Sequence, residues 1–113
     1  ARLLESAAFD RHVRVTRRRL RARRDALAAA LARHIPGTRL EGLAAGLHVV
    51  ARLPRPIDGA ALWRAAQARD VGVYPLGMLG PGYADALVLG YAGLSEPAID
   101  TAVARLAQAL AEA

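Results

Sequence analysis

A long stretch with apolar side chains at helical spacing constrains the fold of this chain more than any other feature. From about Phe9 to His34, apolar residues recur at intervals of seven, seven and four positions, at Val13, Leu20, Leu27 and Leu31. Pro36 and Gly37 follow, and they end a helix because the residue before a proline avoids the α region. We therefore predict one helix over residues 9–34, with few core-like side chains in its first half.

Three short strands are predicted from alternating side chains and from the turn residues that bound them. They span residues 47–53, 71–74 and 86–92. In the third strand, alternation turns Leu87, Leu89 and Tyr91 to one face and Ala86, Val88 and Gly90 to the other. The segment 77–82 is rich in glycine and proline, which predicts a loop.

Two further helices are predicted from their capping residues. Asp58 is a suitable N-cap for a helix through about Arg69, with a buried side built from Leu62, Trp63, Ala65 and Ala66. Ser95 is a suitable cap for the last helix, whose core stripe comprises Ile99, Ala102, Val103, Leu106 and Leu110. The order predicts one α+β domain over residues 1–113, a small antiparallel or mixed sheet of about three strands covered by helices on one face.

Composition excludes several classes of protein. A chain of 113 residues with 54% apolar residues can bury a modest core as a single domain. Zero cysteines exclude disulfides, thiolate metal sites and cysteine catalysis. No apolar run approaches the roughly 18 residues of a membrane span, and the first residues do not read as a signal peptide. We therefore expect a cytoplasmic protein without membrane partners.

The basic charge raises the question of nucleic-acid binding. The net charge is +6, and all sixteen basic residues are arginines, so no lysine-based nucleophile exists in the chain. The arginines of the first helix wrap broadly around it without interleaved aromatics, which favours a solvated or inter-subdomain face over a phosphate-binding one. Among them, Arg24 lies near the apolar stripe, and we expect it to be half-buried and paired.

Three stretches of the chain together resemble the MocR-type transcription regulators of the GntR superfamily. The first is the pair of segments FDRHVR and RRRLRARRDAL at 9–14 and 17–27, and the second is AGLHV at 45–49. The third, GVYPL at 72–76 with LVLGYAGLS at 87–95, is similar to the end of fold-type I aminotransferase-like domains. The likeness covers nearly the whole chain, in order and with suitable gaps.

The resemblance implies a part of a larger regulator. Such a parent has an N-terminal winged helix-turn-helix that binds DNA and an aminotransferase-like domain that binds pyridoxal phosphate and senses an effector. This chain matches the small C-terminal subdomain, with 9–34 as its connecting helix. The missing large subdomain carries the cofactor lysine, so this fragment is expected to hold no cofactor and to be no enzyme alone. The parent is expected to be a homodimer that contacts DNA through its winged helix.

Two departures and one loop bear on function within this resemblance. Leu20 stands where the family often has Tyr, and Val88 stands where working aminotransferases place the arginine that grips the substrate carboxylate. Valine cannot supply a guanidinium fork, which favours a regulator. The alternatives are the C-terminal subdomain of a catalytic class I/II aminotransferase and, on charge alone, a free-standing nucleic-acid binder. The loop after residue 76 borders the ligand entrance in related proteins, which implies an effector-pocket rim of Tyr74, Met78 and Val88.

Other chemical signals favour structural roles. The three histidines, at positions 12, 34 and 48, have no carboxylate at ligand spacing, so no metal site is predicted. Ser95 has no partners for a catalytic triad, and Asp85 with Asp100 makes no convincing acid and base pair. The loop at 77–82 lacks the GK[ST] sequence of a phosphate-binding loop. No catalytic, cofactor-binding or metal-binding residue is therefore predicted.

Overall fold

The computed structural model describes residues 2–41, 48–91 and 93–113. Its first helix, α1, spans Arg2–His34 and so starts seven residues before the predicted start at Phe9. Leu3, Leu4 and the neighbouring alanines are good helix formers, and no proline or glycine interrupts them. The predicted end at His34 is confirmed, and Gly37 takes a positive φ of 90° in the turn that follows.

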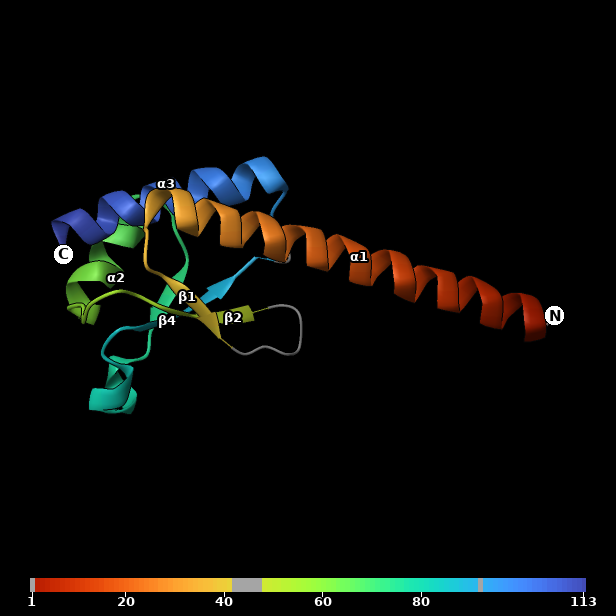
Figure 1. Ribbon diagram of the computed structural model, residues 1–113, viewed down its shortest axis with the longest axis horizontal. Coiled ribbons are helices and arrows are strands. Elements are labelled where there is room, and N and C mark those ends of the chain that lie inside the picture. Colours follow the sequence, from red (N-terminus) through yellow and green to blue (C-terminus); the bar gives the residue numbers. More distant parts are fainter. Residues whose placement is uncertain (1, 42–47, 92) are drawn as a thin grey trace.

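Only the C-terminal part of α1 packs on the rest of the domain. Leu27 and Leu31 are 3% and 2% exposed, whereas Phe9 is 66% exposed. The N-terminal part projects far from the body (Figure 1), which gives the chain extents of 57 × 29 × 23 Å. Arg24 is exposed to solvent, so its predicted half-buried position is wrong. Among the described arginines of α1, the half-buried one is its neighbour Arg23.

The sheet has four antiparallel strands in the order β1-β2-β4-β3. They are β1 (Arg39–Glu41), β2 (His48–Arg52), β3 (Val73–Pro75) and β4 (Ala86–Gly90). The prediction of about three strands missed β1, because three residues are too few to show an alternating pattern. Leu47 and Ala92, at the ends of two predicted strands, lie outside the described residues. The central pair β2 and β4 sets the register, with Val50 opposite Val88 and Arg52 opposite Ala86.

The two remaining helices begin at the predicted caps. Helix α2 spans Gly59–Ala68, and the Asp58 carboxylate accepts a hydrogen bond from the Ala61 amide at 3.1 Å. Helix α3 spans Glu96–Glu112, and the Ser95 hydroxyl accepts one from the Ala98 amide at 3.3 Å. Both side chains satisfy a backbone donor that the first helical turn leaves free.

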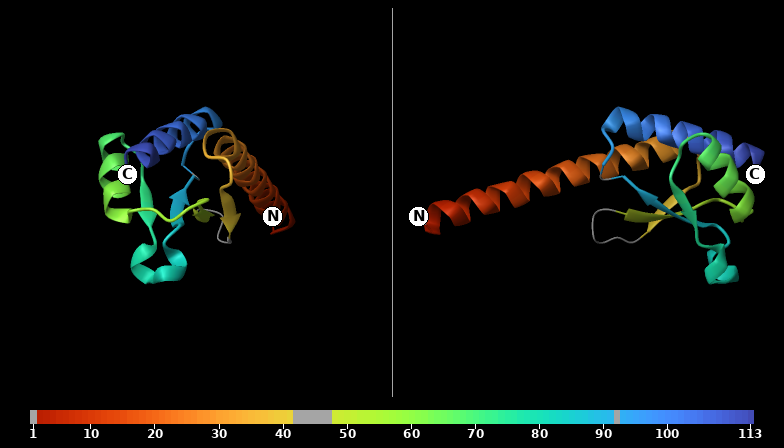
Figure 2. Two further views of the ribbon diagram at one scale, coloured as in Figure 1. Left: turned by 60° about the vertical axis from the view of Figure 1, so that its left-hand side comes forward. Right: turned by 180° about the vertical axis from the view of Figure 1, so that it is seen from behind.

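All three helices cover one face of the sheet, as Figures 1 and 2 show. The core between the layers is built from leucine, valine, isoleucine and alanine, and α1 packs along α3. Asp100 of α3 joins these helices further, since its Oδ1 lies 2.6 Å from Arg33 Nη1 and 3.1 Å from His34 Nε2. Burying this apolar layer supplies the main stabilisation of the domain.

The other face of the sheet is not covered by helices. Residues opposite one another in register share a face, so Val50, Val88 and Tyr74 lie side by side on it, on β2, β4 and β3. The loop between β3 and β4 forms two short 3₁₀ turns, η1 (Gly77–Leu79) and η2 (Pro81–Tyr83). Figure 2 shows this loop projecting away from the helical layer. No helix among the described residues is both long and apolar enough to cross a membrane.

Candidate functional site

The residues predicted to form an effector-pocket rim lie on neighbouring elements. Tyr74 on β3 is 57% exposed, Met78 on η1 is 98% exposed, and Val88 on β4 is half-buried. Tyr74 and Met78 line one hollow of about 550 Å³, together with Gly59, Ala60, Trp63, Pro75 and Gly77. Val88 lies opposite Tyr74 in the β3–β4 register but does not line this hollow. The described residues of its wall carry no charged side chain, so it suits an apolar group.

Trp63 belongs to this hollow, although the helix pattern assigned it to the buried side of α2. Its exposed fraction is 39%, because Leu62 and Ala66 are the α2 side chains that enter the core. The rings of Trp63 and Tyr74 are 6.1 Å apart between centroids and are tilted by 45°. This is a favourable distance for an aromatic pair, which stabilises the contact of α2 with β3. The signal that could have found Trp63 is its position directly beside Leu62, about 100° around the helix.

Arg52 organises the loop that carries η1 and η2. Its Nη1 donates to the Gly82 carbonyl at 2.6 Å and to Asp85 Oδ1 at 2.9 Å, and its Nε donates to Glu41 Oε2 at 3.2 Å. The guanidinium carbon also lies 5.2 Å from the centroid of the Tyr83 ring. The hydrogen bonds to Asp85 and then Glu41 raise the pKa of Arg52, which therefore stays charged.

The Arg52 cluster connects segments that are far apart in the sequence. Two carboxylates and a carbonyl occupy the guanidinium, and its side chain is only 19% exposed. The cluster therefore fixes the loop to the open face of the sheet instead of offering a free fork to a ligand. Sequence reasoning missed this cluster because its members come from three separate segments. The one signal in the sequence is a charged residue, Arg52, within a predicted strand.

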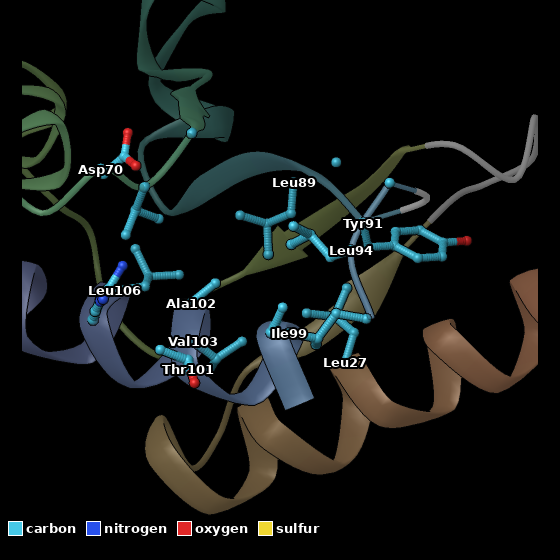
Figure 3. A pocket seen from close by; sticks show the side chains of 16 residues that line it. Leu27, Asp70, Leu89, Tyr91, Leu94, Ile99, Thr101, Ala102, Val103 and Leu106 are labelled. Carbon is cyan, nitrogen blue, oxygen red and sulfur yellow. The ribbon is translucent and has the colours of Figure 1, made fainter. Parts of the chain in front are cut away.

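A larger hollow of about 680 Å³ lies on the helical side, at one end of the sheet. Figure 3 shows it between α1, β4 and α3, with Leu27, Leu89, Ile99 and Leu106 turned toward one another. Asp70 stands at its edge (Figure 3), and the apolar part of its wall is the surface of the hydrophobic core. Its lining also includes the polar side chains of Asp70, Thr101 and Arg105.

Metal binding finds no support in the geometry. Within residues 2–41, 48–91 and 93–113, no group of three or more His, Asp or Glu side chains could hold an ion. His34 instead contacts Asp100 across the α1–α3 interface, and His12 is exposed on α1.

Comparison with solved structures identifies an aminotransferase-like fold. The α-aminoadipate aminotransferase LysN of Thermus thermophilus is 31% identical over 97% of this chain and 29% of that chain, with a TM-score of 0.74. A multiple substrate aminotransferase of Thermococcus profundus is 26% identical over 96% of this chain and 28% of that chain, with a TM-score of 0.77. The kynurenine aminotransferase of Pyrococcus horikoshii shares the fold at 24% identity and a TM-score of 0.76, over 98% of this chain and 28% of its own.

This chain spans less than a third of the length of those enzymes. No protein-family model matches it, and no curated protein sequence matches it. The LysN structure holds N-(5'-phosphopyridoxyl)-L-leucine, and the Pyrococcus structure is described with PMP. The residues of this chain do not fit such a group, since the chain has no lysine and the hollow beside Tyr74 has no cationic side chain for a phosphate among its described residues.

Proposed function

We propose that this chain is the C-terminal part of the effector-sensing domain of a MocR-type transcription regulator and is not catalytic alone. The observation that carries the proposal is Val88, which lies at the centre of the open sheet face of an aminotransferase-like fold. The resemblance of this strand to that of working aminotransferases places Val88 where those enzymes have the arginine that binds the substrate carboxylate. An apolar residue there removes the bidentate contact that holds an amino-acid substrate.

Neighbouring residues do not compensate for the missing arginine. Arg52 shares this face of the sheet on β2, but its guanidinium is occupied by Glu41 and Asp85. Val50 and Tyr74, which flank Val88 in register, carry no positive charge. A substrate carboxylate at this face would be desolvated without a cationic partner, which costs free energy.

The proposal extends to the whole parent protein. The parent carries the large subdomain that binds pyridoxal phosphate, forms a homodimer in the cytoplasm, and contacts DNA through an N-terminal winged helix-turn-helix. Within it, the open face of the sheet and the hollow formed by Tyr74, Met78 and Trp63 border the effector site. The apolar lining of that hollow favours an effector with an apolar part.

A second candidate is the corresponding part of a catalytic aminotransferase. It is favoured by the similarity to three aminotransferases over nearly the whole chain, at up to 31% identity. The two candidates differ in what the parent does to amino acids and to DNA, so one set of measurements separates them.

The test uses the full-length parent with its cofactor. We expect it to bind a specific DNA sequence in an effector-dependent manner and to show no transamination of common amino acids with 2-oxoglutarate. In the parent, Val88→Arg should create measurable affinity for amino-acid carboxylates, whereas the matched Val50→Arg should not. Transamination by the wild-type parent without DNA binding would establish the enzyme instead.

A further inference from the structure

A second, polar hollow adjoins the aromatic pair. It has a volume of about 400 Å³ and is lined by Trp63, Gln67, Asp70, Val71, Gly72 and Tyr74. Trp63 and Tyr74 also line the apolar hollow beside Met78, so the two rings form a boundary that both hollows share. The polar hollow therefore combines two exposed aromatic rings with one carboxylate.

The carboxylate of Asp70 has no partner among the residues that the structure describes. Four other acids, Glu41, Asp85, Asp100 and Glu112, pair with arginines, and Asp58 caps α2. Across the described part of the chain, the Asp70 side chain forms no hydrogen bond or ion pair; the same holds for Asp10, Asp25 and Glu96, but of these four acids only Asp70 lines the polar hollow. The adjacent Arg69 binds Glu112 instead.

The local backbone does not explain an acidic residue at this position. Asp70 has a positive φ of 58°, and its amide and that of Val71 donate to the carbonyls of Gln67 and Ala66. This is the turn that commonly ends a helix, and glycine adopts its left-handed conformation with the least strain. After glycine, asparagine and aspartate tolerate this conformation best, so the backbone permits aspartate but favours it no more than the uncharged asparagine.

We propose that the hollow between Trp63, Tyr74 and Asp70 binds a small organic cation, such as a quaternary ammonium or amine group. Aromatic faces attract weakly hydrated cations, and a carboxylate adds a direct electrostatic attraction. One carboxylate and one amide, Asp70 and Gln67, are too few oxygen ligands for a hard metal ion, which needs about six or more. An anion would be repelled by Asp70. The proposal stands independently of the regulator assignment.

The single tryptophan of the chain allows a direct test. Choline chloride is titrated against the 113-residue chain at constant ionic strength, with sodium chloride replacing choline, and Trp63 emission is recorded. The uncharged 3,3-dimethylbutan-1-ol, which has nearly the same shape, is titrated in parallel. We expect a saturable change with choline and binding at least about fivefold weaker for the alcohol, because only the cation interacts with rings and carboxylate.

Variants then identify the residues responsible. Asp70→Asn keeps the size and the tolerance for a positive φ but removes the charge, and it should weaken choline binding at least about threefold. Tyr74→Leu should weaken choline binding as well. The matched control Asp25→Asn, at an exposed position of α1, should leave choline binding unchanged. Circular dichroism confirms that each variant is folded. Equal responses to choline and the alcohol, or unchanged binding in folded Asp70→Asn, would overturn the proposal.

Discussion

At the scale of single residues, Asp70 has the conformation that departs most from ordinary backbone geometry. It is the one residue other than glycine with a positive φ within the described ranges 2–41, 48–91 and 93–113. Such a conformation costs an ordinary side chain about 1–2 kcal/mol, and aspartate somewhat less because its short polar side chain is tolerated there. The turn itself is well hydrogen-bonded, with Val71 N donating to Ala66 O at 2.9 Å.

We therefore expect opposite effects from two substitutions at this position. Asp70→Gly should leave the free energy of unfolding unchanged or raise it by up to about 1 kcal/mol, because the strain is removed. Asp70→Ala should lower it by about 1 kcal/mol, because alanine fits the left-handed region poorly. Urea denaturation followed by circular dichroism measures both. A more stable alanine than glycine variant would contradict the strain argument.

The pair of Arg69 and Glu112 gives the domain a defined response to acid. Arg69 donates to both carboxylate oxygens of Glu112, at 2.9 Å to one of them, and this lowers the pKa of Glu112 from its ordinary value near 4.5. A carboxyl whose pKa is lowered by folding stabilises the native state above its unfolded pKa. That contribution disappears as the pH falls through the folded pKa.

Glu112→Gln should therefore reduce the melting temperature slightly at pH 7 and not at all once the wild-type carboxyl is protonated. Arg69→Gln also removes the hydrogen bond from Arg69 Nη1 to the Ala65 carbonyl, so its difference from the wild type should shrink on acidification without vanishing. Thermal unfolding between pH 7 and pH 3 tests this. A difference in melting temperature that grows toward low pH would contradict the assigned direction of the pKa shift.

At the scale of elements, α1 is divided into a packed end and a projecting end. Leu27 and Leu31 are buried between α3 and the sheet, whereas Val13 and Leu20 are only half-buried and Phe9 is exposed. The apolar side chains of this stripe therefore contribute different amounts to the stability of the domain at the two ends of the helix. Truncation costs free energy only where neighbouring atoms surround the side chain.

Leu27→Ala and Leu31→Ala should each lower the free energy of unfolding by about 2–5 kcal/mol, and Val13→Ala by less than about 1 kcal/mol. Chemical denaturation at two protein concentrations measures the three variants. Concentration is the control, because self-association through the projecting end would make stability rise with concentration. Equal losses at Val13 and Leu27 in a monomer would show that the boundary lies elsewhere.

How far the elements follow from sequence depends on their length and on their boundary signals. The caps at Asp58 and Ser95 and the end of α1 were predicted correctly, because each has a local chemical cause in the chain. The strand β1 was not, since its three residues gain their conformation from pairing with β2. Trp63 was placed in the core because periodicity assigns a helix face but cannot define how wide the buried stripe is.

At the scale of the whole molecule, chemistry is limited by the residue types that the chain lacks. Without lysine, it has no side-chain amine to form an aldimine with pyridoxal phosphate, and Val88 offers no anchor for a carboxylate. The candidate pocket could be indicated only in part, because Tyr74 and Met78 belong to one continuous segment whereas Trp63 reaches the pocket through a tertiary contact with Tyr74. The overall similarity to aminotransferases therefore concerns the fold.

We accordingly expect the 113-residue chain to neither retain pyridoxal phosphate nor catalyse transamination. After incubation with the cofactor and desalting, its visible absorbance should match that of buffer, because the chain has no lysine and its candidate hollow has no phosphate-binding cation among its described residues. A lysine-containing protein whose aldimine is reduced with borohydride before desalting serves as a positive control for the reaction. Cofactor absorbance that survives desalting at one equivalent per chain would contradict this expectation.

Because α1 is packed only at its C-terminal end, its N-terminal end lies far from the contacts that fix its direction. From Leu27 to Arg2, the helix extends about 37 Å at 1.5 Å per residue, and in Figure 1 this arm stands clear of the body. A rotation of only about 10° at the packed end displaces the far end by about 6 Å. Any change in the packing of α1 on α3, where Asp100 contacts Arg33 and His34, would therefore move the N-terminal end of α1 several times farther than the packed end.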